Sequence, residues 1–331
     1  MTRADSPYTL LLRQEVEAVR RSRDAYLFHE HLEEVNEPLY FHQFAERAAA
    51  HGLRYLGEAD LTVMAPGNFP PEVASVLQVL SADLIHLEQY MDFLRNRMFR
   101  QTLLCHRHLT PNYALRPEQL AAFHVASPTR PVSEKPDMHS TAYEKFEGRD
   151  GITLNSRDPI MKAAMRELAA AWPRALPFED LRAAARARLG QGGTAADAQQ
   201  LGQGLLRCYT SAATNLVELH RCPPQFTLEP GERPCASPLA RLQAAQGGEV
   251  TNLRHETVRL ADFDRHLLRH LDGRRDRAAL LDALEGLAAR GELQVQQDGK
   301  PVRERPRVWE CLGQGLEQQL PALARQALFV S

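Results

Sequence analysis

Proline-rich segments divide this chain of 331 residues into stretches that follow a helical apolar pattern. Prolines recur through residues 106–158, and a second break, "EPGERPCASP", lies at residues 229–238. Because proline lacks a backbone N–H and restricts the residue before it, helices end at or before such segments. The spacing of these breaks predicts three modules, at residues 1–105, 106–232 and 233–331.

Apolar residues recur at helical spacing through the first module. A first helix is predicted over "LLLRQEVEAVRR", and a second with Asn36 as its N-cap and Gly52 after its last turn. A third begins within "NFPPEVASVLQVL", and a fourth runs through "QYMDFLRNRMFRQTLLCH", residues 89–106. Residues 26–32 fit either a helix or a strand.

The two later modules share an order of short strand, three helices and closing strands, which is that of a winged helix. Their sequences also echo each other, since "LGQGLLRCYTSAATNLVEL" in the middle module is matched by "LGQGLEQQLPALARQALFV" in the last. We therefore predict an α+β fold that is mainly helical, in which a helical N-terminal module is followed by two winged-helix-like modules.

Charge and hydropathy argue against several classes of protein. The 40 basic and 42 acidic residues give a net charge of -2, so no electrostatic footprint for nucleic acid shows at the level of the whole chain. The longest apolar runs are far below the roughly twenty residues needed to cross a bilayer, and the N-terminus lacks the apolar core of a signal peptide. The 5 cysteines are scattered without a CxxC pair, and we expect reduced thiols in a cytoplasmic protein.

The chain lacks the glycine-rich turns by which nucleotide sites hold phosphates or an adenosine ribose. "GQGG" at residues 190–193 follows a predicted helix, while Gly202 and Gly204 fall inside a helical pattern. No P-loop, GxSxG elbow or H-E-x-x-H motif occurs. We therefore expect this chain alone to bind no dinucleotide and no S-adenosylmethionine (SAM) in a Rossmann-type site, and we assign no catalytic residue.

The stretch "YLFHEHLEEVNEPLYFHQF", residues 26–44, gathers three histidines and four glutamates. His29 and Glu33 would share a face in a helix, whereas His29 and His31 would share one only in a strand. No single conformation therefore supplies the three ligands of a catalytic metal site or the four of a closed one. "CHRH" at residues 105–108 lies at a predicted helix end, where histidines commonly meet the last carbonyls. No metal is expected at either place.

Arginines concentrate in "DFLRNRMFRQ", within the predicted fourth helix. Arg95 and Arg97 are expected on different faces of that helix, which could force one of them inward toward a carboxylate. Glu58 is a candidate counter-charge. The alternative is a solvated helix face that carries only weak local ion pairs.

The two predicted recognition helices carry little net positive charge. "PFEDLRAAARARL" has three arginines against two acidic residues, and "DRAALLDALEGLAAR" has two against three. Because neutralisation of phosphates supplies much of the affinity of proteins for DNA, this charge balance favours binding of a protein or peptide over DNA.

Longer stretches of the chain resemble a known family. "YLFHEHLEEVNEPLYFHQFAERAAAHGLRYLGEADL" and "QYMDFLRNRMFRQTLLCH" are similar to the methyltransferase regulatory domain found C-terminal to class I SAM-dependent methyltransferase domains in bacteria. "FHVASPTRPVSE", "WPRALPFEDL", "ASPLARLQA" and "TNLRHETVRL" resemble the downstream region of the same proteins. The larger family includes proteins similar to the bacterial protein lysine methyltransferases that modify outer-membrane proteins. There, a cofactor domain is followed by a helical dimerisation region, a middle domain and a C-terminal domain framing a wide substrate cleft.

In that family the cofactor domain precedes the "SPY…LLRQE" helix, which begins here six residues after Met1. The resemblance therefore implies that SAM is bound by a partner domain, and that this chain is a non-catalytic regulatory or substrate-recognition part of a protein methyltransferase system. The partners it implies are a class I methyltransferase domain or subunit in trans, a protein substrate, and a second copy of the chain in a homodimer. Neither nucleic acid nor a membrane is expected as a partner.

We predict that a polar and aromatic seam contacts such a partner, together with the arginine segment and its counter-charge. The candidate residues are His29, Glu30, Asn36, Tyr40, Phe41, His42, Glu58, Arg95, Arg97 and Arg100. Two other classes stay open, a DNA-binding regulator built on tandem winged helices and a metal-dependent enzyme that uses the His/Glu cluster.

Overall fold

The computed structural model describes residues 6–148, 151–190, 195–211, 216–297 and 300–330. The chain divides into two compact units, Met1–Asn112 and Tyr113–Ser331, here called unit 1 and unit 2. Helices predominate and the sheets are small and antiparallel, which confirms the predicted mainly helical α+β fold. The three-module boundaries stay a prediction. Among the helices of the described residues, none has both the length and the hydrophobicity that crossing a bilayer requires.

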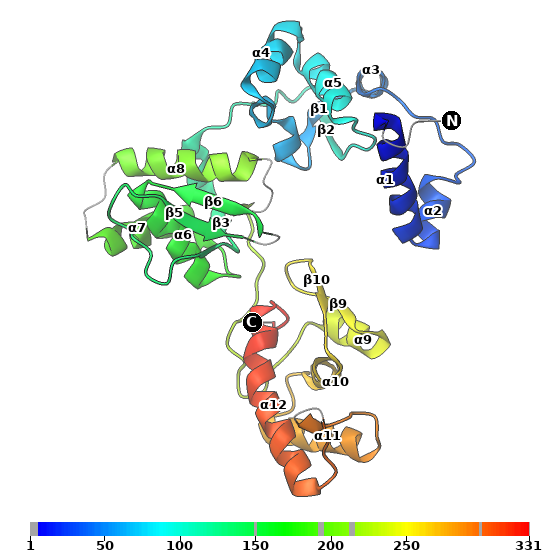
Figure 1. Ribbon diagram of the computed structural model, residues 1–331, viewed down its shortest axis with the longest axis vertical. Coiled ribbons are helices and arrows are strands. Elements are labelled where there is room, and N and C mark those ends of the chain that lie inside the picture. The colour runs from blue at the N-terminus through cyan, green and yellow to red at the C-terminus, as the bar shows by residue number, and fades with distance from the viewer. Residues whose placement is uncertain (1–5, 149–150, 191–194, 212–215, 298–299, 331) are drawn as a thin grey trace. The chain divides into compact units, whose positions relative to one another are not determined.

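Unit 1 combines helices with one two-stranded antiparallel ladder (Figure 1). The ladder places Leu53 opposite His106 and Glu58 opposite Thr102. The core side chains include Phe41, Tyr55, Leu77 and Met91. The elements are α1 (Pro7–Arg21), α2 (Asp24–Glu30), α3 (Phe41–Ala50), β1 (Leu53–Glu58), the short 3-10 helices η1 (Leu61–Met64) and η2 (Pro66–Asn68), α4 (Pro71–Leu80), α5 (Leu84–Arg95) and β2 (Thr102–His106).

The end of α5 corrects the predicted fourth helix. The helix predicted over residues 89–106 ends at Arg95, because Asn96 adopts a left-handed conformation with φ 48° and ψ 48°. Beyond it the chain turns into strand β2, so Cys105 and His106 lie in a strand and not at a helix end.

The start of α3 also differs from the prediction. Asn36, the expected N-cap, instead donates from its side-chain amide to the carbonyl of Glu30 at 3.1 Å. Tyr40 holds the N-cap position, and its N–H donates to the side-chain oxygen of Gln43 at 3.0 Å. Gly52 follows the helix with a φ of +73°, a conformation that glycine adopts without strain.

The first part of unit 2 combines helices with two three-stranded antiparallel sheets, of strand order β7-β3-β8 and β4-β5-β6. Its core includes the fully buried side chains of Phe146, Met165 and Leu168. The elements are η3 (Pro117–Ala122), β3 (His124–Ala126), β4 (Arg130–Pro131), β5 (Glu144–Glu147), β6 (Thr153–Ser156), α6 (Pro159–Ala171), β7 (Leu176–Pro177), α7 (Phe178–Leu189), α8 (Ala195–Thr210) and β8 (Glu218–His220).

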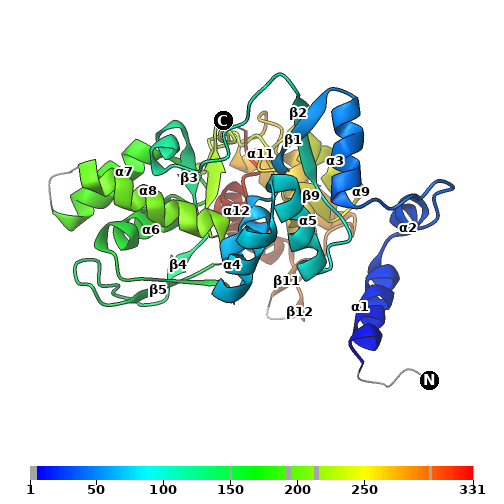
Figure 2. The ribbon, with the colours of Figure 1, turned by 90° about the horizontal axis from the view of Figure 1, so that it is seen from above.

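The second part of unit 2 is a set of helices with two short hairpins, of which β11–β12 is labelled in Figure 2. Its core is separate from that of the first part and includes Leu267, Leu284 and Leu320. The elements are α9 (Pro238–Gln246), β9 (Glu249–Thr251), β10 (Thr257–Arg259), α10 (Asp262–His270), α11 (Arg277–Ala289), β11 (Gln296–Gln297), β12 (Lys300–Pro301) and α12 (Arg305–Arg325).

Arg254, in the loop between β9 and β10, connects the two parts of unit 2. Its Nη2 donates to both carboxylate oxygens of Glu218 at 2.8 and 2.7 Å, and its Nη1 donates to the carbonyl of Pro173 at 2.9 Å. The guanidinium also lies 4.4 Å over the ring of Trp172, and only 5% of the Arg254 side chain is exposed. We call these four residues the Arg254 joint. Its planar, stacked geometry requires a guanidinium rather than an ammonium group.

Two glycines of α8 allow close packing against other elements. A Cβ at Gly202 would lie 2.8 Å from the Cβ of Pro117 in η3, and a Cβ at Gly204 would lie 2.9 Å from the sulfur of Met161 in α6. Glycine therefore lets α8 approach its neighbours, which accounts for glycines inside a helical pattern.

We expect Gly202→Ala to lower the free energy of unfolding by about 1–3 kcal/mol, because the added methyl group overpacks the contact with Pro117. Gly313→Ala, inside α12 with nothing within 4 Å of the new Cβ, should raise it by about 0.5–1 kcal/mol through helix propensity. Urea unfolding followed by circular dichroism measures both variants. Stabilisation by both substitutions would contradict a packing role for Gly202.

Candidate functional site

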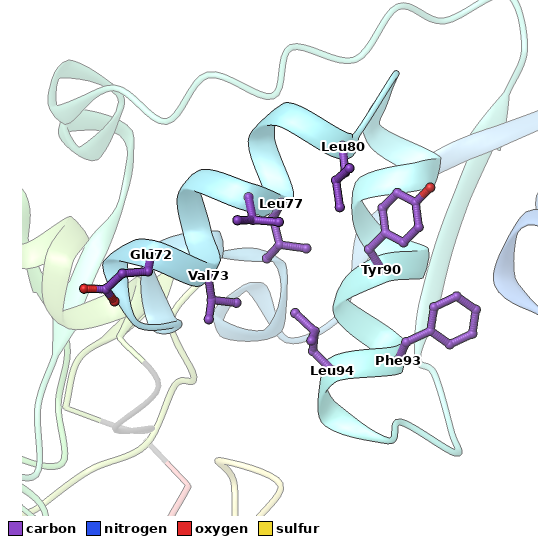
Figure 3. A pocket seen from close by; sticks show the side chains of 8 residues that line it. Glu72, Val73, Leu77, Leu80, Tyr90, Phe93 and Leu94 are labelled. Atoms are coloured by element: carbon purple, nitrogen blue, oxygen red, sulfur yellow. The ribbon is translucent and has the colours of Figure 1, made fainter.

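A groove between α4 and α5 is open and almost wholly apolar, as Figure 3 shows from close by. Its volume is about 390 Å³. Large apolar side chains stay exposed in it, and Phe93 is 57% exposed. We call it the α4/α5 groove, and its lining residues are Glu72, Val73, Val76, Leu77, Leu80, Tyr90, Phe93 and Leu94.

A second hollow, of about 450 Å³, lies between the start of α3 and the segment that follows α5. Met98 and Phe99 on its wall are 68% and 69% exposed. It is lined by Leu39, Phe41, Phe44, Asp92, Arg97, Met98, Phe99, Arg100 and Thr102.

Tyr40 connects the two hollows. Its ring, 58% exposed, meets Phe93 edge to face with the ring centroids 5.7 Å apart. Phe93 lines the groove, while Leu39 and Phe41 on either side of Tyr40 line the second hollow. We call the two hollows and Tyr40 together the apolar face of unit 1. The groove and the exposed side chains of Tyr40, Met98 and Phe99 are apolar surface of the kind that typically marks a site of interaction with another protein, whereas charged and polar side chains also line the second hollow.

A buried ionic cluster around Arg100 lies next to the second hollow. Arg100 donates to Glu58 at 3.0 Å, to Glu88 at 2.5 Å and to Asp92 at 3.3 Å, so that one guanidinium meets three carboxylates. The side chains of Glu58 and Glu88 are 2% and 0% exposed, against 13% for Arg100. Arg100 also lies 3.6 Å over the ring of Phe41, where cation and ring attract each other. The cluster holds β1, α5 and the segment before β2 in one arrangement.

Glu58 accepts further hydrogen bonds inside unit 1. The Gln101 N–H donates to it at 3.1 Å and the Thr102 hydroxyl at 3.0 Å. The Tyr55 hydroxyl donates at 3.3 Å. A buried carboxylate is tolerated only when donors and counter-charges satisfy it in this way. The cluster is therefore part of the structural core of the unit.

Burial raises the pKa of Glu88 and of Asp92 above the ordinary carboxyl values, while the charges of Arg100 and Arg97 act in the opposite direction. Burial likewise raises the pKa of the Tyr55 hydroxyl. These shifts show that the cost of desolvating the two carboxylates outweighs the stabilisation that the arginine charges give them.

Arg95 and Arg97 converge, in contrast to the expectation that they lie on different faces of a helix. Because Asn96 is left-handed, both guanidinium groups donate to the carbonyl of Val63, and the Arg97 bond measures 3.3 Å. Arg95 in addition lies 4.3 Å over the ring of Phe69. Arg97 reaches Asp92 at 3.2 Å. Both arginines thus make their contacts within unit 1.

The predicted seam residues fall into two places. His29 and Glu30 lie in α2 on exposed surface, where Nδ1 of His29 lies 3.2 Å from Glu33. Tyr40 belongs to the apolar face, and the backbone N–H of His42 donates to Gln89 at 3.2 Å.

The structure places Phe41 in the core, where only 3% of it is exposed beneath Arg100. Phe41 therefore contributes only a small exposed area to the wall of the second hollow, and the exposed ring at this point is that of Tyr40. The assignment of the candidate residues to partner binding stays a prediction.

Sequence reasoning missed most residues of the apolar face. Val76, Leu80 and Leu94 fit the helical apolar pattern of this module, and the sequence predicts no contact role for them or for Phe93. A signal was nevertheless present, because "VASVLQVL" in α4 has apolar residues on more than one side of the helix. A surface helix that is apolar over more than one stripe needs a second covering surface.

Neither alternative class gains support from the described residues. Within them, no group of three or more His, Cys, Asp and Glu side chains could hold a metal ion. A DNA-binding helix would use its arginines to contact phosphates. The arginines of α7 instead pair with carboxylates, Arg182 with Glu179, Arg186 with Asp197 and Arg188 with Glu167.

The fold contains two recognised domains. Residues 23–106 match the family model of the predicted methyltransferase regulatory domain, and residues 232–328 match that of the PKMT C-terminal winged helix domain. The resemblance found in the sequence is therefore confirmed, and the chain carries domains that occur in methyltransferases.

Individual relatives extend the match over nearly the whole chain. The uncharacterized protein RP789 of Rickettsia prowazekii (strain Madrid E) is 28% identical over 98% of this chain, and RP027 of the same organism is 26% identical over 55% of it. The structure of PKMT2 from Rickettsia typhi in complex with AdoHcy superposes on 99% of this chain with a TM-score of 0.83 at 25% identity. A second PKMT2 structure from the same organism superposes on this chain with a TM-score of 0.82. This chain spans 59% of RP789, 77% of RP027 and 66% of the PKMT2 chain.

Proposed function

We propose that this chain is the regulatory and protein-recognition part of a SAM-dependent protein methyltransferase system. In this proposal the apolar face of unit 1 binds a class I methyltransferase domain or subunit, and unit 2 contributes to recognition of the protein substrate. A homodimer of the chain belongs to the same proposal. The observation that carries it is the apolar face itself, which lies within the residues matched by the regulatory domain family.

The chemistry of the face suits a protein partner. A surface with exposed Phe93, Met98 and Phe99 gains free energy when another apolar surface covers it, by about 25 cal/mol for each Å² removed from water. Tyr40 adds a hydroxyl at the edge of an aromatic ring, a combination that is common at interface hot spots. The ionic cluster joins α5 to β1 and to the segment that follows α5, and a surface that is ordered before binding loses less entropy when a partner binds.

The cofactor of such a system is SAM, and the described residues do not fit it. A class I site needs glycines that leave backbone N–H groups free beside the ligand. Gly202 and Gly204 instead face Pro117 and Met161 inside packed helices. We therefore place SAM on the methyltransferase domain and derive no catalytic step from the residues of this chain.

Capture of the partner tests the proposal. The chain with an affinity tag is incubated with native extract, washed and eluted, and radiolabelled SAM is then added to the eluate. We expect a class I methyltransferase in the eluate by mass spectrometry, and transfer of label to a protein. An eluate without methyltransferase or label transfer would contradict the proposal.

Substitutions in the apolar face locate the contact. We expect Tyr40→Ala with Phe93→Ala to weaken capture by at least about tenfold, because each truncated hot-spot ring costs about 1–2 kcal/mol or more. Tyr143→Ala, which truncates an exposed ring in unit 2, is the matched control and should capture normally. Unchanged capture by the double variant would exclude the apolar face as the contact.

A further inference from the structure

Helix α1 presents an apolar stripe that stays exposed among the described residues. Tyr8, Leu12, Val16 and Val19 recur every three or four residues, and therefore share one side of the helix. All four are exposed, and none of the residues of this fully described helix is buried. A helix of 15 residues is marginal in water by itself and is normally stabilised by packing of its apolar side. The stripe therefore calls for a complementary surface.

The α4/α5 groove in the same unit has the complementary character. It is an apolar depression between two helices, and a helix lies into such a depression through side chains at spacings of three and four. Among the described residues that line it, Glu72 carries a charge, and it lies at the end of α4 remote from Leu80. The last turn of α1 carries Arg20 and Arg21, which would meet that charge.

The connection between the two is long enough. The chain leaves α1 through α2 and residues 31–40, and reaches Tyr40, which contacts Phe93 at the edge of the groove. Residues 31–40 can span up to about 33 Å when extended. α4 has 10 residues and is about 15 Å long. The tether therefore lets α1 lie along the whole groove of its own chain.

We propose that α1 folds back and lays its apolar stripe in the α4/α5 groove of the same chain, where it covers the groove until a partner displaces it. The inference rests on the proposed function, because it makes α1 a regulator of the surface that binds the partner. α1 precedes residues 23–106, the span matched by the regulatory domain family, so it is an arm attached to that domain.

Photo-crosslinking in the full chain tests the contact directly. Leu80, which lines the groove and is exposed, is replaced by p-benzoylphenylalanine in a mixture of ¹⁵N-labelled and unlabelled protein. We expect cross-linked peptides that join residue 80 to residues 7–21 with both halves of one isotope. Peptides of mixed isotope would assign the arm to a second copy, and the absence of cross-links to residues 7–21 would leave α1 outside the groove. Either result overturns the proposal.

Two matched variants test the stripe. Val16→Asp should reduce the cross-link at least about tenfold, because a carboxylate buried in an apolar groove costs more than about 1.4 kcal/mol. Gln14→Asp introduces the same charge on the other side of α1 and should leave the yield unchanged. Equal yields from both variants would contradict docking through the stripe.

The outcomes separate the arm from the partner surface. If α1 covers the groove, Val16→Asp should also increase partner capture severalfold over Gln14→Asp. Capture of the methyltransferase without any cross-link to α1 would support the proposed function and contradict docking of α1 in the groove. A chain with the cross-link but no methyltransferase in the eluate refutes the proposed function alone.

Discussion

Arg100→Met is expected to lower the free energy of unfolding of unit 1 by about 3–5 kcal/mol, because the substitution removes the guanidinium that contacts three buried carboxylates and leaves Arg97 as the cation beside Glu88 and Asp92. Glu58 and Glu88 both contact this guanidinium, and neither side chain has appreciable exposure to water. Methionine retains most of the apolar stem, so the loss reports the missing charge. Hydrogen exchange of residues 53–106, followed by mass spectrometry, measures the stability of this unit separately from unit 2.

The loss should depend on pH. Burial already raises the pKa of Glu88, and removal of the Arg100 charge, which opposes that rise, raises it further. A carboxyl whose folded pKa lies above its unfolded value contributes stability that is present at low pH and is lost as pH rises through the folded pKa. The difference between Arg100→Met and the parent chain should therefore be largest near neutral pH and shrink as pH falls toward 4.5, the ordinary glutamate value.

Arg47→Met is the matched control for this substitution. Arg47 pairs with Glu37 at 3.5 Å on exposed surface, where ion pairs contribute about 0–1 kcal/mol. A loss of similar size in both variants, or one that is independent of pH, would mean that the cluster does not stabilise unit 1 through its charges.

Arg254→Met is expected to be the next most damaging change, with a loss of about 2–3 kcal/mol in unit 2, because it removes charged hydrogen bonds to Glu218 and the stacking on Trp172. The two parts of unit 2 have separate cores, so they should then unfold in two calorimetric transitions, whereas unit 2 of the parent chain is expected to unfold in one. Arg254→Lys should restore only part of the loss, since an ammonium group cannot reproduce the planar contacts.

Arg259→Met provides the control for the Arg254 joint. Arg259 lies in the same hairpin, in strand β10, and makes an exposed ion pair with Glu249 at 3.1 Å. The variant Arg259→Met should leave both the number of calorimetric transitions and the midpoint temperature of unfolding unchanged. A single transition in Arg254→Met at the parent midpoint would show that the joint does not couple the two parts.

The sequence predicted what depends on local spacing. The fold class and the family resemblance are confirmed, and the apolar pattern indicated α1, α3, α4 and the start of α5. The predicted end of this last helix was wrong, because the apolar pattern continues past Asn96, where the helix ends. Asn96 itself was a usable signal, since asparagine enters the left-handed region more readily than most residues.

The ionic cluster depends on contacts that spacing cannot predict. Glu58 and Arg100 are 42 positions apart, and helical or strand periodicity relates residues only a few positions apart. The sequence could therefore name Glu58 as a counter-charge without specifying its partner. Phe41 illustrates the same limit, because it and Tyr40 are adjacent aromatic residues, and only the packing of α3 on α5 decides which of them is exposed.

The ionic cluster joins segments that are far apart in the sequence, and this determines how unit 1 unfolds locally. The five cysteines are free, so no covalent bond joins β1 to the segment after α5. The Arg100 guanidinium takes that place, and it does so only when both segments and α5 are all present, since each supplies a charge. If any one of these three segments separated, the charges on the other two would stay buried and lose an ion-pair partner. These segments should therefore lose their amide protection together, as a single cooperative unit.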